Sequence, residues 1–444
     1  MEQNLDERRE KRRKRRKRNQ AVAYLVLIVV LAALSVGIVV GFNYLTGPGR
    51  KKPTESKEVA SSSVEESTVE STEEVVASSE VVETEVEVVP EKTTLQKLDE
   101  IANAGIEVMP LEDKVAGLFI ISPELLTGVD RATKAGDGTK EALSKYPVGG
   151  LIYSSKNMLD PDQFKEMVNN TKLFSNYPLF LGTIEEGGGN SSFYVAEFIQ
   201  RLNDPKQIAM TGDANVAHNT GSEIGTYMSE YGLNINLGPV ADVVVGDNTV
   251  LGNRSFGSDS VVVSTYVAAM VEGLKEHQIT PCLKQFPGIG SASQNPNAGI
   301  ATTERTAEDF RANEFVVYQS QINEGISMIM VSNLSVPSLD ESGVPCSLSN
   351  KVVTDILRNE LAYDGVIVSD ALNVPSITEY YTSEEAAIGA LKAGCDMIYM
   401  PENFEAAYNG VLQAVKDGVI SEERINDALR RIYRIKYADK VAEE

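Results

Sequence analysis

From about Leu95 onward, short apolar runs alternate with longer amphipathic stretches, and this alternation constrains the fold more than any other feature of the chain. Eight runs have the length and the continuous apolar character of strands buried on both faces, and they cover 117–122, 148–154, 179–184, 233–240, 279–285, 326–332, 365–369 and 396–400. Helical periodicity is clearest over 213–231, 260–276, 307–323, 350–361, 383–393, 404–416 and 421–437.

Eight strands that alternate with helices predict an α/β fold with a parallel sheet, and the count favours a (β/α)8 TIM barrel over residues 95–440. A doubly wound open sheet is the alternative. It is disfavoured because no Gly-x-Gly-x-x-Gly turn follows an early strand.

The chain before the barrel divides into three further segments. Residues 1–20 form a basic tail, which we expect in the cytoplasm by the positive-inside rule. Residues 21–45 contain about 22 uncharged residues, enough to cross a bilayer, and predict an uncleaved transmembrane anchor. Residues 46–94 are rich in Glu, Ser, Thr and Val without periodicity and predict a disordered stalk. The sequence thus predicts a single-pass cell-membrane protein whose barrel lies outside the cytoplasm.

Composition narrows the kinds of partner and cofactor. A formal net charge of −23, despite the basic tail, argues against nucleic acid as a partner. The two histidines, His218 and His277, fall within or at the end of helices, so we expect no metal site and no cofactor. The cysteines Cys282 and Cys395 lie in apolar runs, which predicts buried free thiols.

Polar side chains stand where the predicted strands end, and in a barrel of this type such residues meet on one rim. They follow the third to seventh strands and comprise Glu185, Glu186, Asp242, Arg254, Lys284, Gln285, Asn333 and Asp370. Strand-end polar residues often only cap the next helix, but their joint placement predicts a functional site.

Three kinds of chemistry fit these residues. Asp370, fixed at the end of a buried strand, is a candidate nucleophile for glycosyl transfer, with Lys284 and Arg254 holding sugar hydroxyls. Lys284 could instead form a Schiff base with a carbonyl substrate. A binding module that keeps the pocket but lacks turnover is the third possibility.

Six motifs, in order along the chain, resemble those of family 3 glycoside hydrolases. They are VGGLI from Val148, EEGG from Glu185, NLGPVAD from Asn236, GNRSFG from Gly252, KQFPG from Lys284 and DGVIVSD from Asp364. The similarity is to the single-domain β-N-acetylglucosaminidase type, which acts on N-acetylhexosamine residues with retention of configuration. The resemblance places Asp370 at the nucleophile, Arg254 and Lys284 at sugar-binding positions, and Asp242 at an aspartate near the site.

The sequence lacks the residues that transfer protons in this family. It also lacks a substrate-binding aspartate and an arginine of the motif after the third strand. The usual Lys-His-Phe-Pro-Gly-His-Gly has Gln285 and Ile289 in place of its histidines, and the Asp-Ser-His acid/base dyad corresponds to Asn295-Pro296-Asn297. An aspartate and an arginine of Asp-Gln-Glu-Gly-Gly-Arg become Ile184 and Gly189, and a histidine after the sixth strand becomes Asn333.

The resemblance therefore implies a β-N-acetylhexosaminidase-like glycoside hydrolase whose usual acid/base is absent or replaced, with Glu185 as a hypothetical substitute acid. Gln285, Glu186 and Asn333 are further substrate-binding candidates. The expected partner is a carbohydrate, such as an amino-sugar glycan of the cell wall or a peptidoglycan fragment. The alternative is an inactive sugar-binding pseudo-hydrolase at the cell surface.

Overall fold

The computed structural model describes residues 92–246 and 250–442. The basic tail, the expected anchor at 21–45 and the expected stalk at 46–94, apart from its last three residues, lie outside the described residues. Among the described residues, no helix is both long enough and apolar enough to span a bilayer.

Eight parallel strands form the centre of the molecule, as the sequence predicts. They are β1 (Phe119–Ile121), β2 (Gly150–Ile152), β3 (Phe180–Thr183), β4 (Ile235–Asn236), β5 (Thr280–Phe286), β6 (Met328–Val331), β7 (Val366–Ser369) and β8 (Ile398–Tyr399). Strands β1 to β7 pair in the order of the sequence, and β1 also pairs with β8 through Phe119 and Ile398. A bridge between Val368 and Met397 joins β7 to β8. These contacts bring the sheet round into a TIM barrel and not an open sheet.

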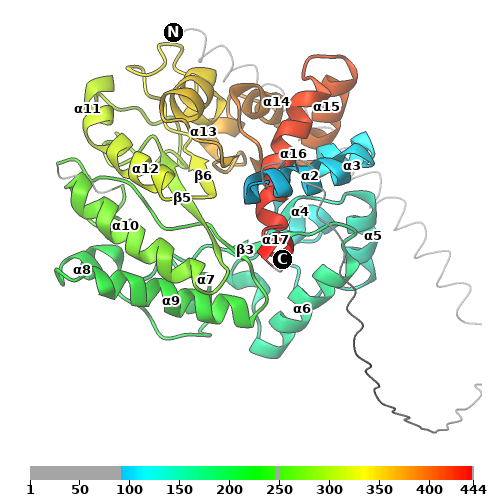
Figure 1. Cartoon of the computed structure of the whole chain (residues 1–444), viewed down its shortest axis with the longest axis horizontal. Coiled ribbons are helices and arrows are strands. Elements are labelled where there is room, and N and C mark those ends of the chain that lie inside the picture. Colours follow the sequence, from blue (N-terminus) through cyan, green and yellow to red (C-terminus); the bar gives the residue numbers. More distant parts are fainter. Residues whose placement is uncertain (1–91, 247–249, 443–444) are drawn as a thin grey trace, which may run out of the picture. The chain divides into compact units, whose positions relative to one another are not determined.

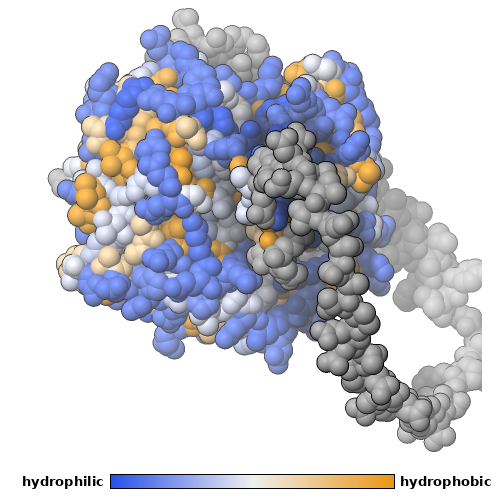
Figure 2. All heavy atoms as spheres, viewed as in Figure 1, coloured by the Kyte–Doolittle hydropathy of each residue, from blue (hydrophilic) through white to orange (hydrophobic). Residues whose placement is uncertain are grey.

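Helices surround the strands (Figure 1). They are α2 (Thr94–Glu107), α3 (Leu111–Ala116), α4 (Pro123–Thr127), α5 (Asp137–Lys145), α6 (Pro161–Phe174), α7 (Ser192–Val195), α8 (Pro205–Ala209), α9 (Ala214–Glu230), α10 (Ser260–Lys275), α11 (Ala307–Ala312), α12 (Glu314–Asn323), α13 (Pro375–Thr378), α14 (Ser383–Ala393), α15 (Phe404–Lys416), α16 (Glu422–Lys436) and α17 (Asp439–Ala442), with 3₁₀ turns η1 (Ser155–Asn157) and η2 (Cys346–Leu348) and a π-helix η3 (Lys351–Glu360). Polar residues cover much of the surface seen in Figure 2.

The predicted helix over 307–323 is two helices. Asn313, with φ −127° and ψ −78°, separates α11 from α12, because this backbone geometry lies outside the helical region. The predicted helix over 350–361 is the π-helix η3. The remaining predicted helices agree with α9, α10, α14, α15 and α16 to within a residue or two at their ends.

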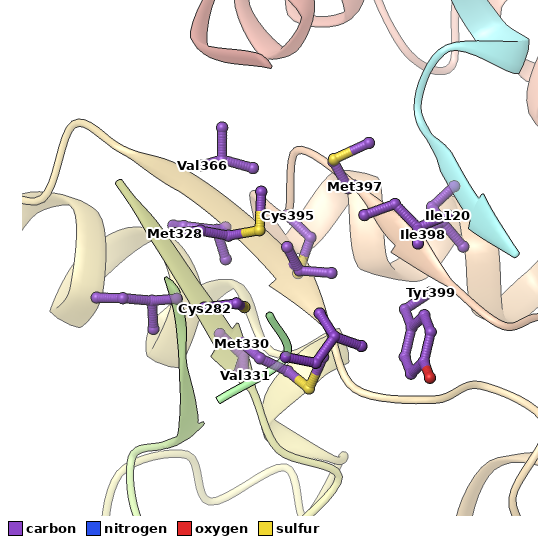
Figure 3. Close-up of a cluster of buried hydrophobic side chains, with 14 of the residues drawn as sticks. Ile120, Cys282, Met328, Met330, Val331, Val366, Cys395, Met397, Ile398 and Tyr399 are labelled. Carbon is purple, nitrogen blue, oxygen red and sulfur yellow. The ribbon is translucent and has the colours of Figure 1, made fainter. Parts of the chain in front are cut away.

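Apolar side chains from several strands fill the barrel. Figure 3 shows Ile120 of β1, Cys282 of β5, Met328 of β6 and Val366 of β7 gathered with residues of β8. The cysteines are buried and free, as predicted. Such an interior is a packed core and not a channel, so any ligand site must lie at an end of the barrel.

Candidate functional site

A cavity of about 550 Å³ opens where the strands end. Its walls come from the connections after β3, β4, β5 and β7 and from residues within β5, β6 and β8. The lining residues are Ile184, Glu186, Gly189, Asn190, Arg201, Asp204, Leu237, Val250, Asn253, Arg254, Lys284, Gln285, Ile289, Asn295, Asn297, Met330, Asp370, Ala371 and Tyr399. This is the end of the barrel at which TIM-barrel enzymes bind their substrates. Five predicted site residues are among them: Glu186, Arg254, Lys284, Gln285 and Asp370.

Lys284 and Gln285 both line the cavity although they are neighbours in β5. Consecutive residues of a regular strand face opposite sides of the sheet. Here the register between β5 and β6 shifts between Leu283 and Phe286, so β5 is not a regular strand at these residues. The alternation of faces is therefore not expected to hold for Lys284 and Gln285, and both side chains line one cavity.

Glu186 holds the two predicted sugar-binding cations. Its Oε1 lies 2.6 Å from the Lys284 Nζ, and Arg254 donates to it through Nε at 2.6 Å and Nη2 at 2.8 Å. Burial alone would raise the pKa of Glu186, but the charges of Lys284 and Arg254 outweigh it and lower the pKa to about 2. Glu186 is therefore ionised and fixes both cations against one wall. The Lys284 nitrogen is engaged in this ion pair, which disfavours the Schiff-base chemistry.

Asp370 directly follows β7 and is only 5% exposed. The amide of Ala371 donates to its Oδ1 at 2.7 Å, and Gln285 Nε2 lies 3.5 Å from its Oδ2. Burial raises the pKa of Asp370, and the Ala371 amide and the charge of Lys284 oppose that rise. Oδ1 is thus firmly held, whereas Oδ2 has one long contact and keeps a lone pair available to a ligand in the cavity.

Asp242 lies beside the cavity but does not line it. Its Oδ1 accepts from the Ile289 amide at 2.9 Å and the Gln285 amide at 3.4 Å, so it supports the turn after β5. Its Oδ2 is buried and has no partner among the described residues. Burial raises the pKa of Asp242 to about 7.

Glu185, the hypothetical substitute acid, does not line the cavity either. Ser191 donates to its carboxylate at 2.5 Å, Tyr227 at 2.7 Å and the Phe193 amide at 3.1 Å. Burial raises the pKa of Glu185 to about 7. The carboxylate is thus engaged with α7 and α9, and its position gives no support to a role in protonating a leaving group.

Asn333, a further substrate-binding candidate, is occupied within the protein. Its Nδ2 donates to the Ala371 carbonyl at 2.8 Å, and Ser347 donates to its Oδ1 at 2.6 Å. Because Ala371 follows Asp370, Asn333 supports the backbone next to Asp370, and it is not among the residues that line the cavity.

The loop over 288–303, where the resemblance expects an acid/base dyad, presents Asn295 and Asn297 to the cavity. Ser293 and Thr302 pair through their backbones at 2.8 Å, and Thr302 forms a bridge with Ser335. The loop is therefore anchored on both sides, but an amide side chain can neither give nor take a proton at neutral pH.

Sequence reasoning missed Arg201, Asp204, Asn253 and Tyr399, which also line the cavity. Arg201 and Asp204 belong to a connection between the short helices α7 and α8, where no strand end marks them. Tyr399 lies in β8 and has a pKa raised by burial. The apolar residues around Tyr399 predict a strand over 396–400. They do not predict that the Tyr399 side chain lines the cavity.

The histidines and acidic residues offer no metal centre in the described part of the chain, where no three His, Cys, Asp or Glu side chains cluster suitably. His218 lies in α9 and contacts Glu276, and His277 follows α10 and contacts Ser222. Neither lines the cavity.

Comparisons with known proteins agree with this geometry. The family model described as "Glycosyl hydrolase family 3 N terminal domain" matches residues 110–435. Beta-hexosaminidase LpqI of Mycobacterium tuberculosis is 29% identical over 346 residues, covering 75% of this chain and 84% of the relative. Beta-hexosaminidase A of Pseudoalteromonas piscicida is 25% identical over 333 residues, covering 67% of this chain but only 54% of the relative. The chain thus spans about half the length of some curated relatives.

Solved structures show the same fold. A glycoside hydrolase family 3 β-N-acetylglucosaminidase from Paenibacillus sp. str. FPU-7 superposes with a TM-score of 0.69 at 27% identity, covering 76% of this chain and 64% of that one. The structure of M. tuberculosis LpqI superposes with a TM-score of 0.68 at 26% identity, covering 76% and 96%. Since the family match spans most of the barrel, the chain belongs to glycosyl hydrolase family 3.

Proposed function

We propose that the barrel binds a terminal β-linked N-acetylhexosamine and retains the nucleophilic half of a retaining glycosidase, while the group that protonates the leaving oxygen is missing. The observation that carries this proposal is the cavity itself. It joins Asp370 to the Glu186–Arg254–Lys284 cluster, whereas the loop over 288–303 contributes the amides Asn295 and Asn297.

The cluster of Glu186, Arg254 and Lys284 supports sugar binding. Fixed cations with unused donor hydrogens can hold ring hydroxyls, and their attachment to Glu186 reduces the entropy lost when a ligand binds. Asp370 would attack the anomeric carbon of the bound sugar, forming a glycosyl ester as the bond to the leaving oxygen breaks.

The leaving oxygen then has to depart without a proton from the protein. A phenolate with electron-withdrawing substituents can do so, but the alkoxide of a natural sugar departs poorly. Loss of general acid/base catalysis typically lowers rates by about 10²–10⁴-fold. We therefore expect slow turnover of activated aryl glycosides and little turnover of natural glycans.

The proposed natural ligand is an amino-sugar glycan of the cell wall or a peptidoglycan fragment. Support comes from the type of relatives and from the apolar segment at 21–45, which is suited to anchoring the chain in the cell membrane with the barrel outside the cytoplasm. The acidic barrel is suited to a carbohydrate and not to a nucleic acid.

The test uses the purified full chain with 4-nitrophenyl N-acetyl-β-D-glucosaminide and with N,N′-diacetylchitobiose. We expect slow release of nitrophenol from the first and no detectable cleavage of the second. Sodium azide should accelerate nitrophenol turnover and yield the β-configured glycosyl azide, because azide attacks the glycosyl–Asp370 ester without a general base. Asp370→Asn should abolish both reactions.

Two outcomes would overturn this proposal. Rapid chitobiose cleavage would show that a group on the chain protonates the leaving oxygen. Activity that survives Asp370→Asn would show that Asp370 is not the nucleophile.

A sugar-binding protein without any turnover is the second candidate. It is favoured by the raised pKa of buried Asp370 and by the ion pairs that already occupy Glu186. Calorimetric binding of N-acetylglucosamine without nitrophenol release, with or without azide, would select it.

A further inference from the structure

Arg201 brings a third cation to the cavity, and neither the fold nor the six motifs pointed to it. Its Nη2 donates to both oxygens of Asp204, at 3.0 and 2.9 Å, and its side chain is 43% exposed. Its Nε and Nη1 have no hydrogen-bond partner among residues 92–246 and 250–442. Arg201 therefore keeps donors for a ligand.

Hydrogen bonds to Asp204 fix the Arg201 side chain, and Asp204 is in turn fixed by contacts with α8 and Asn253. Asp204 caps α8 in a reciprocal capping box with Gln207. Asn253 lies within 3.5 Å of the Asp204 carboxylate, and its carbonyl accepts from the Lys206 amide at 3.1 Å. Because Asn253 precedes Arg254, residues 201–204 are hydrogen-bonded to the loop that carries Arg254, a candidate sugar-binding residue.

Three consecutive glycines leave room for this segment. A Cβ on Gly187 would lie 2.8 Å from the Asn203 carbonyl, and one on Gly188 would lie 1.8 Å from the Asp204 carboxylate. A Cβ on Gly189 would lie 4.0 Å from Arg201 Nη2, so a longer side chain there would grow into the guanidinium. Gly189 stands where the family resemblance expects an arginine, and Arg201 reaches this space from another segment.

The cations of the cavity differ in how fully they are neutralised. Lys284 and Arg254 share the buried Glu186, and Lys284 is 4% exposed. Among the described residues, Arg201 is paired through one nitrogen only, and its side chain is more exposed than that of Lys284 or Arg254. A partly exposed arginine with unused N–H groups can donate hydrogen bonds from them to a second carboxylate.

We propose that Arg201 is a specificity-determining residue that binds a carboxylate carried by the glycan. This inference rests on the proposed function, in which the cavity takes an amino sugar. The carboxylate has two possible sources: an ether substituent on the bound amino sugar, or an acidic sugar unit joined to it.

The experiment measures dissociation constants by calorimetry on the full-length chain. The probes are N-acetylglucosamine, its 3-O-lactyl ether, the methylamide of that ether, and N-acetylglucosaminyl-β-1,4-glucuronic acid. Arg201→Ala should weaken binding of a carboxylate-bearing probe by about tenfold and leave N-acetylglucosamine and the methylamide almost unchanged. Whichever charged probe shows this loss identifies the source of the carboxylate.

Arg311→Ala is the matched control. Arg311 also pairs with one carboxylate, that of Glu360, its side chain is 45% exposed, and it does not line the cavity. The control removes the same charge and should leave all four dissociation constants unchanged.

Each outcome bears on one proposal. If N-acetylglucosamine binds and Arg201→Ala affects charged and neutral probes equally, or affects none, Arg201 does not recognise a carboxylate and the inference is wrong. If no probe binds the wild-type chain, the proposed function itself fails.

Discussion

The carboxylates Glu185 and Glu186 are adjacent in the sequence but have opposite electrostatic environments. Glu186 is ionised between two cations, and its pKa is lowered to about 2. Glu185 has three hydrogen-bond donors but no cation, and burial raises its pKa to about 7. Ionic contacts, and not burial alone, decide the charge of each residue.

Glu185 should make stability depend on pH. Between its unfolded pKa near 4.5 and its folded pKa near 7, the folded chain keeps a proton that the unfolded chain releases. The free energy of unfolding should therefore fall as pH rises through this window. Glu185→Gln should reduce that fall by on the order of 1–3 kcal/mol, as measured by urea unfolding between pH 5 and pH 8.

Asp242 has a similarly raised pKa, so part of the fall should remain in Glu185→Gln. The exposed Glu341 provides a control, and Glu341→Gln should leave the pH dependence as it is. An unchanged slope in Glu185→Gln would show that Glu185 is already ionised at pH 5.

At the scale of elements, the loop after β5 keeps the frame of an acid/base loop without its titrating groups. Its backbone is anchored at Ser293, Thr302 and Ser335, and Asn295 and Asn297 line the cavity. The frame should therefore tolerate new side chains at these two positions.

Restoring the family's residues should restore proton transfer. The triple variant Asn295→Asp/Pro296→Ser/Asn297→His should raise chitobiose cleavage by about 10²-fold or more, with a pH optimum set by the new histidine. The same variant with Asn297→Ala in place of Asn297→His is the control. Equal rates in the two folded variants would mean that the loop cannot bring a histidine to the glycosidic oxygen.

Two glycines in the connection between β3 and β4, Gly188 and Gly212, differ in how strongly a side chain would destabilise the fold. Gly188 and Gly212 have positive φ values of 60° and 72°, but only Gly188 faces an atom that a Cβ would overlap. Gly212→Ala should cost about 1–2 kcal/mol through backbone strain alone. Gly188→Ala should cost about 1–3 kcal/mol more, because it displaces Asp204. Equal losses by thermal or urea unfolding would show that the Asp204 segment adapts freely.

Across the whole molecule, a cluster of charged side chains connects helix α16 to the barrel. Buried Asp396, which precedes β8, pairs with Arg358 at 2.8 Å, with Arg431 at 3.1 Å and with Arg424 at 3.3 Å. Arg424 and Arg431 belong to α16 and Arg358 belongs to η3, so the cluster links both helices to the residue before β8.

Removing the charge of Asp396 should destabilise the fold strongly. Asp396→Asn leaves three partly buried guanidinium groups without their shared partner and should cost about 3–5 kcal/mol in the free energy of unfolding. Glu360→Gln breaks the exposed Arg311 pair and should cost less than about 1 kcal/mol. A small effect of Asp396→Asn in urea unfolding would contradict a stabilising role for the cluster.

The barrel, its eight strands and the end of the barrel at which the cavity lies are all predictable from the amino-acid sequence. Continuous apolar runs predict strands buried on both faces, and parallel strands bring their carboxyl ends to one rim. Asp370, Lys284, Gln285, Arg254 and Glu186 therefore meet at the cavity as predicted.

Which of the neighbouring polar residues line that cavity depends on how the connections pack in three dimensions. Glu185 and Glu186 have different surroundings, whereas Lys284 and Gln285 line the same cavity at a point where β5 is irregular. Arg201 and Asp204 reach the cavity from an irregular connection that has no periodicity to mark it. Periodicity fixes faces only within regular elements, so bulges and connections place their side chains through packing that no local pattern records.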